Sequence, residues 1–349
     1  MSPVVVALAA PRQVELIDEP SRPLGSDEVR IRTLLSGISA GTEMAFYRGT
    51  NPYLHKRWDP SSRLFTKGSS EGMAFPITTW GYEEVGEVTE AGPDATLAPG
   101  ARVFGTWGHR SSHVAAASSF ETRVLPSDAN PLLGIFSHIG AIALNGVLDA
   151  APRLRETVAV FGLGVVGQLV AQLLRHAGAR VIGLDLLPDR RHIASSLGVS
   201  IVLDPGEGNV AERIKELTDG RGADLCIEAS GSSRALHEAV RACAYNSRVV
   251  ALGFYQGEAS GLFLGEEFHH NRVAVVCSQI GGLAPDLQHR WDRARLVRTF
   301  MDLAIRGTVR CAELVTQRVS YRDAASVYRQ LDEVPRSVLQ AVLDFSDAP

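Results

Sequence analysis

The run from Val158 to Phe161 and the glycine-rich stretch 162–167 after it constrain the fold more than any other part of the chain. A β-rich apolar run leads into glycines spaced G-x-G-x-x-G, and the amphipathic run 168–176 follows. This order predicts a strand, a tight turn and a helix. In such a turn the first glycine permits the bend, the second lets a pyrophosphate approach the backbone, and the third lets helix and strand pack closely. The N-terminus of the helix then offers free N–H groups to the phosphates.

A second strand-like run begins at Arg180 and ends in Asp185, an acid 18 residues after Gly167. A carboxylate at this place binds the ribose 2′-OH of NAD. A 2′-phosphate about 4 Å from a carboxylate costs several kcal/mol at an effective dielectric of 20, so we expect NAD and not NADP. Arg190 and Arg191 follow closely and leave the NADP alternative open.

Strand-like and helix-like runs alternate after the glycine turn. Strands are predicted at 180–185, 200–204, 223–229, 247–253 and 272–278, and helices near 188–197, 209–218, 233–244 and 292–306. This alternation predicts an α/β fold with a doubly wound parallel sheet, the Rossmann arrangement. The residues that we expect to bind the cofactor are Gly162, Gly164, Val165, Val166, Gly167, Asp185, Arg190, Ser230, Leu252, Gly253, Ser278 and Gln279.

Composition excludes several classes of protein. A chain of 349 residues exceeds the usual size of one core, so two domains are expected. The net charge of −4 argues against a nucleic-acid binder. The four cysteines are far apart and form no C-x-x-C, which favours reduced thiols in the cytoplasm. Residues 4–10 resemble a first strand and not a signal peptide, and no apolar run approaches the roughly 18 residues that span a membrane.

The first part of the chain is predicted to be rich in short strands. They are expected at 4–9, 13–18, 28–35, 101–106 and 113–116, with a helix at 131–147 and a helix–strand tail at 320–345. Residues 46–72 form an insertion with little periodicity and several basic side chains. Two interpretations stay open for it: a solvated loop, or a lid whose positive charge meets a polar or anionic substrate.

Several motifs together resemble one family over nearly the whole chain. They are Gly37–Glu43, Gly81–Gly86, Pro99–Phe104, the dinucleotide turn and Gly222–Gly231. The chain resembles the medium-chain dehydrogenase/reductase superfamily, the alcohol-dehydrogenase-like enzymes. The resemblance implies a GroES-like β-rich catalytic domain formed by 1–137 and 281–349, and a Rossmann domain at 138–280.

The chain departs from this family at the places that bind zinc. Zinc-dependent members present Cys in a G-x-C-G-[ST]-[DE]-like turn, His in G-H-E, and Cys or an acid where the helix before the nucleotide domain starts. The matching places hold Ser39 (or Ala40 in a shifted register), Tyr82, and Ser137 beside His138. Serine, alanine and tyrosine are poor zinc ligands. The resemblance therefore implies a zinc-free branch with no metal, and the alternative is a residual site of Glu83, His138 and Glu43.

A narrower resemblance concerns the substrate. The 46–72 insertion, Phe268–Arg272, Ser278–Gly282 and His289–Arg295 are similar to a set of bacterial sugar and glycoside dehydrogenases that make 3-keto sugars. The similarity to bacteriochlorophyllide dehydrogenases is more distant. The narrower resemblance as a whole implies a polar, polyhydroxylated or bulky small-molecule substrate. We expect the chain to assemble as a homodimer or homotetramer.

Three residues are candidates for the catalytic groups. Oxidation of a secondary alcohol needs the hydroxyl proton removed and the developing alkoxide stabilised. Thr42 stands where the family keeps a proton-relay hydroxyl. Tyr82 can donate a hydrogen bond, or act as base if its pKa falls well below about 10, and His138, with an ordinary pKa near 6.5, can pass a proton outward. The structural alternatives stay open: a turn cap, a filler of the vacated zinc space and a helix-face histidine.

Other polar residues near these motifs are expected to have supporting roles. Glu43 and Glu83 are expected to brace the site through hydrogen bonds. His109 and His113 could reach the substrate, and we favour a position at the surface for both. Gln340 stands where relatives place a basic residue near the cofactor pyrophosphate, so that contact is expected to be weaker.

Three aromatic or histidine residues in the second half stay without a catalytic role. His269 and His270 are adjacent, so on an extended chain they point to opposite sides, which favours a loop over a metal pair. Trp291 either stacks on a sugar ring or anchors the tail helix.

The sequence predicts an NAD-dependent, zinc-independent oxidoreductase that moves hydride between nicotinamide and a secondary alcohol or ketone of a sugar-like or cyclitol substrate. One alternative is an NADPH-dependent quinone or enone reductase, and Asp185 counts against it. The other is a cofactor-binding structural or regulatory protein without catalysis. The retained hydroxyls, His138 and the 46–72 insertion count against that one.

Overall fold

The computed structural model describes residues 2–67, 73–334, 336 and 338–348. The chain divides into two compact units: a first unit of Met1–His138 with Val315–Pro349, and a second unit of Ile139–Leu314. Residues 281–314, expected with the first unit, belong to the second. The reason is helix α7 (Arg293–Ile305). Its Phe300 packs so closely on Gly140 that a Cβ there would lie 2.0 Å from the ring.

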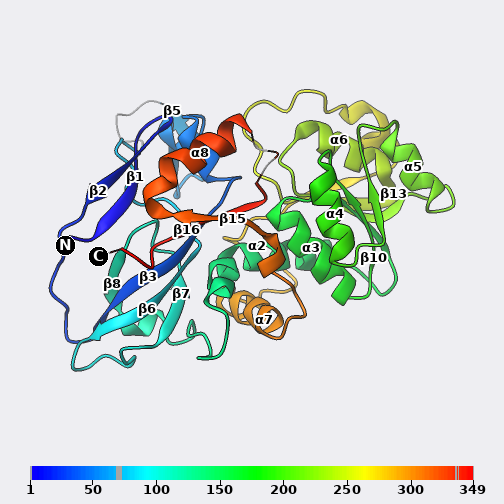
Figure 1. The fold of residues 1–349 in the computed structure, drawn as a ribbon. Coiled ribbons are helices and arrows are strands. Elements are labelled where there is room, and N and C mark those ends of the chain that lie inside the picture. Colours follow the sequence, from blue (N-terminus) through cyan, green and yellow to red (C-terminus); the bar gives the residue numbers. More distant parts are fainter. Residues whose placement is uncertain (1, 68–72, 335, 337, 349) are drawn as a thin grey trace. The chain divides into compact units, whose positions relative to one another are not determined.

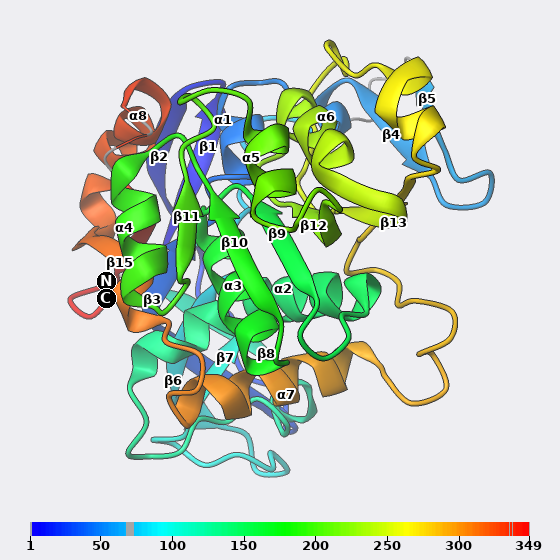
Figure 2. The same ribbon diagram turned by 90° about the vertical axis from the view of Figure 1, so that its right-hand side faces the viewer.

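The second unit is built on one six-stranded parallel sheet. Figure 2 shows most of its strands side by side, in the order β11-β10-β9-β12-β13-β14. This is the doubly wound arrangement, in which the order of strand addition reverses between β9 and β12. It confirms the predicted fold class. Its strands are β9 (Thr157–Phe161), β10 (Arg180–Leu184), β11 (Ile201–Leu203), β12 (Ala223–Glu228), β13 (Cys243–Ala251) and β14 (Ala274–Cys277).

Helices cover this sheet because their apolar residues recur on one face. In α6 (Ser233–Ala242), the apolar residues at 236, 239 and 240 are buried at the spacing of one helix face. The helical segments are α2 (Phe136–Ala150, which crosses from the first unit), α3 (Val165–His176), α4 (Pro188–Ser196), α5 (Val210–Glu216), α6 (Ser233–Ala242), η4 (Leu264–Phe268), α7 and η5 (Ala312–Leu314).

The first unit is β-rich, as expected, and the end of the chain completes its sheet. Strand β16 lies antiparallel against β3, with Ala341 opposite Ile38 and Leu343 opposite Ser36 (Figure 1). The larger sheet has the order β15-β16-β3-β6-β7, with β8 also paired to β3. Its strands are β3 (Glu28–Ile38), β6 (Glu84–Ala91), β7 (Arg102–Gly105), β8 (Ser112–Ala116), β15 (Val315–Ser320) and β16 (Gln340–Asp344), beside the hairpin β1 (Val4–Ala10) and β2 (Gln13–Asp18).

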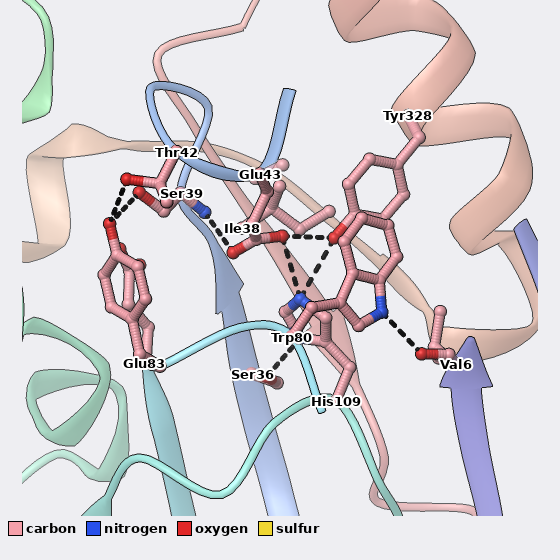
Figure 3. Close-up of polar contacts among 12 residues, drawn as sticks. Val6, Ser36, Ile38, Ser39, Thr42, Glu43, Trp80, Glu83, His109 and Tyr328 are labelled. Carbon is pink, nitrogen blue, oxygen red and sulfur yellow. Dashed lines mark hydrogen bonds and ion pairs between the residues drawn. The ribbon is translucent and has the colours of Figure 1, made fainter. Parts of the chain in front are cut away.

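Three stacked aromatic rings form one part of the core of the first unit. Tyr328 stacks on Trp80 with ring centroids 4.6 Å apart and on Tyr47 at 5.7 Å. The Trp80 indole donates to the Val6 carbonyl over 2.7 Å (Figure 3). The remaining short helices of this unit are α1 (Glu43–Tyr47), η1 (Pro52–Leu54), η2 (Ala117–Ser119), η3 (Pro131–Ile135), η6 (Tyr321–Asp323) and α8 (Ala324–Glu333).

Much of the 46–72 insertion is regular, although its sequence showed little periodicity. Strands β4 (Lys56–Asp59) and β5 (Leu64–Lys67) form a two-stranded hairpin. The pairing places Trp58 opposite Phe65, and their rings meet edge to face at 5.1 Å. We name β4, β5 and their connection the aromatic hairpin. Residues 68–72 of the insertion lie outside the described residues.

One helical segment, Pro131–Ala150, is long and apolar enough to cross a membrane by length and composition alone. The expectation that no run reaches this length was therefore wrong. Of the tested window, 67% is buried within the protein, which is typical of a core helix. The segment packs its apolar side chains inward instead of exposing an apolar belt.

Candidate functional site

The glycine turn between β9 and α3 has the geometry that a dinucleotide needs. Gly162 adopts φ +93°, a conformation that side-chain-bearing residues rarely take. A Cβ on Gly167 would lie 1.8 Å from the Gly162 carbonyl oxygen, so strand and helix approach closely only because both are glycine. Above Gly164 the space is open, since a Cβ there would meet only Arg190, at 3.9 Å. These residues fit a pyrophosphate at the N-terminus of α3.

Asp185 lies at the end of β10 and faces the same turn. Its carboxylate accepts hydrogen bonds from the backbone N–H groups of Leu163 at 2.8 Å and Leu187 at 2.9 Å. The acid is therefore fixed beside the glycines, where it can meet a ribose. The Arg190 guanidinium lies 3.7 Å from it, whereas Arg191 pairs with Asp204 at 2.9 Å.

The other expected cofactor residues follow the later strands of the same sheet. The carboxyl ends of parallel strands lie along one edge of a sheet. These residues therefore lie along the same edge as the glycine turn. Ser278 continues the backbone pairing after β14 and accepts from Asn145 over 3.3 Å. The Gln279 side chain accepts from Gly281 N–H. Leu252 and Gly253 follow β13, and the N–H of each donates to the carbonyl oxygen at the end of β12.

Glu228, at the end of β12, is a buried acid whose role the sequence analysis did not assign. Its carboxylate accepts from the Ser230 hydroxyl, from the N–H groups of Ser230 and Gly231, and from the Tyr255 hydroxyl at 2.5 Å. A Cβ on Gly253 would lie 2.7 Å from this carboxylate. Glu228 therefore holds together two of the turns expected to line the cofactor. An acid directly before Ala-Ser-Gly was the available signal.

In the first unit, three hydroxyl groups from two segments of the chain meet. Ser39 follows β3, Thr42 precedes α1, and Tyr82 precedes β6. The Tyr82 hydroxyl bonds to the Ser39 hydroxyl and lies 3.1 Å from the Thr42 hydroxyl. Thr42 makes no side-chain cap to α1, so it is not the turn cap considered above. We name Ser39, Thr42 and Tyr82 the hydroxyl cluster; Ser39, and not Ala40, contributes to it (Figure 3).

Tyr82 is a phenol here and not a poised base. Burial raises its pKa well above the ordinary value near 10. The condition for a role as base, a lowered pKa, is therefore not met, and the hydrogen-bonding role remains. The His138 ring lies edge to face against the Tyr82 ring, with centroids 5.0 Å apart. The structure thus brings all three catalytic candidates together in one unit.

The residues at the former ligand places do not fit zinc. Ser39 and Tyr82 bind each other through their hydroxyls, and Ser137 is a third hydroxyl. Catalytic zinc needs three nitrogen, sulfur or carboxylate ligands. Within the described ranges, the one group of three or more His, Cys, Asp or Glu side chains close enough to share an ion lies in the second unit, at His237, Glu266 and Glu267.

The two acids considered for a residual metal site have other partners. Glu83 is fully buried, and its carboxyl accepts from Gln340 at 3.1 Å. Burial, followed by the charges of Glu43 and Glu84, raises the pKa of Glu83 well above its ordinary value, which favours the neutral acid. Gln340 is itself buried and also donates to the Ile38 carbonyl. It braces Glu83 inside the first unit, and so differs from the pyrophosphate contact considered for that position.

His109 is buried completely, so its expected surface position was wrong. Its Nε2 lies 2.9 Å from a Glu43 carboxylate oxygen, and its Nδ1 lies 2.6 Å from the Ser36 hydroxyl (Figure 3). Tyr328 of α8 also binds Glu43 through its hydroxyl. These partners satisfy both ring nitrogens, which is what allows a histidine to be buried.

His113 differs from His109, four residues before it. Its ring stacks on Trp107 with centroids 5.6 Å apart. Burial, with the charges of Arg110 and Arg22, lowers the pKa of His113 to about 4, so it is neutral at physiological pH. It is partly buried, and its ring also meets the Phe120 ring edge to face.

The remaining candidates lie in the second unit. His269 and His270 are exposed, and His270 bonds to the Glu266 carbonyl one helical turn earlier. The Arg295 guanidinium lies over the Trp291 ring, 4.3 Å from its centroid, so one face of Trp291 is covered. All four cysteines are free thiols, and Cys277 is the exposed one.

The chain is similar in sequence to one family model and to several known dehydrogenases. The family described as zinc-binding dehydrogenase matches residues 165–295. D-guloside 3-dehydrogenase of Escherichia coli is 31% identical over 344 residues, with 96% of this chain and 98% of that protein covered. A Rhodobacter capsulatus protein, 2-desacetyl-2-hydroxyethyl bacteriochlorophyllide A dehydrogenase, is 26% identical over 363 residues and covers 100% of both chains.

Solved structures share the fold. A zinc-binding dehydrogenase-like protein of Sinorhizobium meliloti 1021, crystallised with NADP, superposes with a TM-score of 0.79. It is 21% identical, and 99% of each chain is covered. At this identity the likeness shows the architecture and does not extend to the cofactor.

Proposed function

The chain belongs to the medium-chain dehydrogenase/reductase superfamily and is an oxidoreductase; on that premise we propose an NAD-dependent, zinc-independent dehydrogenase of sugar-like secondary alcohols. The observation that carries the proposal is the hydroxyl cluster, in which Ser39 and Tyr82 stand at places where zinc-dependent members of the superfamily bind the metal. A phenol oxygen in contact with two further hydroxyls can bind and exchange a proton with a substrate hydroxyl.

A sugar-like substrate is supported by the relatives and by the polarity of the cluster. The protein that matches at 31% identity over nearly its whole length is named for a glycoside. Hydroxyl groups both donate and accept, so they suit a substrate that carries several hydroxyls. A site that pairs its own hydroxyls with substrate hydroxyls also rejects analogues that lack them, because buried polar groups would be left without partners.

The proposed mechanism assigns a task to each group. The bound nicotinamide supplies the hydride acceptor. The Tyr82 hydroxyl binds the substrate oxygen, and Ser39 and Thr42 bind the Tyr82 oxygen in turn. As the substrate hydroxyl proton moves to the Tyr82 oxygen, the phenol proton passes on to Ser39 or Thr42, which gives up its own hydroxyl proton in the same step. A free phenolate never has to form, which is consistent with the raised pKa of Tyr82. His138, against the Tyr82 ring, is the group proposed to pass the proton outward.

NAD is proposed over NADP because of Asp185. The carboxylate is fixed by two backbone N–H groups, so it cannot easily turn away from a 2′-phosphate. Arg191 is engaged by Asp204 and by the Asp185 carbonyl, which leaves Arg190 as the one nearby cation of the pair beside the acid. We weigh the repulsion between the Asp185 carboxylate and a 2′-phosphate above the attraction between Arg190 and that phosphate.

The experiment measures reduction of NAD⁺ and of NADP⁺ over a panel of glycosides, free sugars and cyclitols, with and without a chelator. The expected result is NADH formation with at least one glycoside or cyclitol, unchanged by chelation. Tyr82→Phe serves as the matched inactive control, since it keeps the ring. Reduction of quinones or enones by NADPH without any alcohol oxidation would favour the reductase alternative. Cofactor binding without turnover of any class would favour a non-catalytic role.

A further inference from the structure

His109 contacts both of the segments that carry the hydroxyl cluster. On one side its Nε2 lies 2.9 Å from Glu43, the residue directly after Thr42. On the other side its ring packs against Gly81, the residue directly before Tyr82. A Cβ on Gly81 would lie 2.6 Å from Nε2, and Gly81 adopts φ +87°. No side chain would fit between them, so a shift of this ring shifts both segments.

The hydrogen bonds around His109 can be assigned by counting donors. A hydroxyl has one hydrogen to donate. The Ser36 hydroxyl donates to Glu84 at 3.0 Å, and the Tyr328 hydroxyl donates to Glu43. Both hydroxyls therefore face the imidazole with oxygen lone pairs only.

The surroundings of Glu84 bear on the first of these assignments. Burial raises the pKa of its carboxyl, whereas the neighbouring His109 and its hydrogen bonds lower that pKa. Besides Ser36, it accepts from the backbone N–H groups of Glu83 at 3.1 Å and Trp107 at 2.7 Å. Three donors around one carboxyl favour its charged form, and we assign it as a carboxylate. The Ser36 hydrogen therefore stays with Glu84.

We infer that His109 is a buried imidazolium, with Nδ1–H donating to Ser36 and Nε2–H donating to Glu43, and that this ion pair positions the hydroxyl cluster. The first half stands on hydrogen-bond geometry alone, and the second half rests on the proposed function. The titratable groups that face His109 are Glu43 at the start of α1, Glu84 on β6 through Ser36, and Tyr328 on α8.

Glu43 transmits the position of His109 to the cluster. One of its carboxylate oxygens accepts from the Ser39 N–H at 2.8 Å, and its own N–H donates to the Ser39 carbonyl at 2.9 Å. Two hydrogen bonds thus join Ser39 and Glu43, the first and last residues of this loop. The other carboxylate oxygen binds His109 and Tyr328, and Tyr328 is itself held between two stacked rings. His109 and Glu43 touch no reacting atom and are positioning residues.

The first arm of the experiment determines the protonation of His109 by nitrogen NMR of histidine-labelled protein, assigned by comparison with His109→Gln. The expected result is that both ring nitrogens of His109 carry protons at neutral pH. His113 is the internal control, because its pKa of about 4 makes it neutral there. One unprotonated nitrogen on His109 would overturn the imidazolium. This arm needs no substrate, so it decides the question even if no alcohol is turned over.

The second arm separates positioning from simple stability. His109→Gln and Glu43→Gln are compared with His113→Gln for folding, NADH affinity, kcat and KM, at a temperature where all are folded. Misplaced catalytic groups lose about 10–100-fold in rate. We expect that loss in kcat for the first two, with NADH affinity within about twofold, and no loss for His113→Gln. Full kcat in folded His109→Gln would overturn the positioning role. A wild-type enzyme inactive on every alcohol would instead remove the proposed function and leave the first arm intact.

Discussion

The single phenol oxygen of Tyr82 meets two other hydroxyls, so removing that atom alone tests the proposed relay. Tyr82→Phe keeps the ring and its contact with His138. Loss of a proton-transfer group lowers kcat by roughly 10²–10⁴. We expect a folded variant that binds NADH as the wild type does and loses most turnover, measured by initial rates and by calorimetry. Full activity would return Tyr82 to core packing and leave Thr42 and His138 as the proton carriers.

Asp185 determines cofactor choice at the same scale. In Asp185→Ala the repulsion toward a 2′-phosphate disappears, and Arg190, 3.7 Å away, is freed to face that phosphate. We expect the preference for NAD over NADP to narrow by about tenfold or more, since repulsion between two charges about 4 Å apart costs several kcal/mol at an effective dielectric of 20. Calorimetric titration of both cofactors into both proteins measures this. Equal affinities for NAD and NADP in the unmodified protein would contradict the assignment.

Glu83 makes a prediction about pH. Its pKa is raised in the folded state by burial and by Glu43 and Glu84, whereas in the unfolded chain it ionises near its ordinary value. Above that value the unfolded state has lost a proton that the folded state keeps, so stability falls as pH rises. The slope is at most about 1.4 kcal/mol per pH unit for one proton.

The matched variant for that prediction is Glu83→Gln, which imitates the neutral acid and keeps an acceptor for Gln340. We expect equal stability near pH 4 and a widening advantage for the variant toward pH 8, measured by urea unfolding at each pH. A wild type that gains on the variant as pH rises would show that the carboxyl is charged when folded.

His109 shows why sequence reasoning about single residues fails. Thr42, Tyr82 and His138 were predictable because the family motifs place them. The environment of His109 depends on Glu43 and Tyr328, which lie 66 and 219 residues away along the chain. No local pattern distinguishes a histidine with such partners from a surface histidine. The raised pKa of Tyr82 could not be predicted for a related reason, since it is caused by burial, which depends on the packing of distant segments.

At the scale of elements, the strands and helices of the second unit were predictable because their hydrophobic periodicity is strong. The aromatic hairpin was not, because its strands have four residues each, with one aromatic side chain apiece and charged side chains at Lys56, Arg57, Asp59 and Lys67. Only the pairing of Trp58 with Phe65 reveals the apolar face. The end of the second unit was misplaced because α7 packs on α2 through Phe300 and Gly140, a contact with no sequence signal.

The aromatic hairpin allows a test of the lid interpretation. Trp58, Phe65 and Tyr53 leave 39%, 41% and 44% of their surfaces exposed while their rings touch, an arrangement that can stack on a sugar ring. We expect Trp58→Ala to raise KM for a bulky glycoside by about tenfold, with NADH affinity unchanged. Thr66→Ala, on the opposite face of the hairpin by strand alternation, is the control. Equal KM values in all three proteins would leave the hairpin as a solvated loop.

At the scale of the whole molecule, the family relationship and the chemistry of the site point in different directions on zinc. The family description names a zinc-binding dehydrogenase and matches residues 165–295, a segment within the second unit. The ligand places lie in the first unit, where hydroxyls stand instead of thiolate and imidazole. Under the proposed function, the chain keeps the fold and the dinucleotide turn while side chains carry its proton chemistry.

Metal independence is therefore the prediction that concerns the enzyme as a whole. We expect purified protein to keep its turnover after exhaustive chelation, and elemental analysis to find far less than one zinc per active site. The group of His237, Glu266 and Glu267 complicates a bare metal count, because its ligand atoms lie within 4.8 Å of one another and can collect an ion. His237→Ala removes that group without touching the hydroxyl cluster. Any zinc on the wild type should be lost in this variant with activity unchanged. Stoichiometric zinc that remains in His237→Ala, and whose removal stops turnover, would place a catalytic metal in the first unit and overturn the hydroxyl relay.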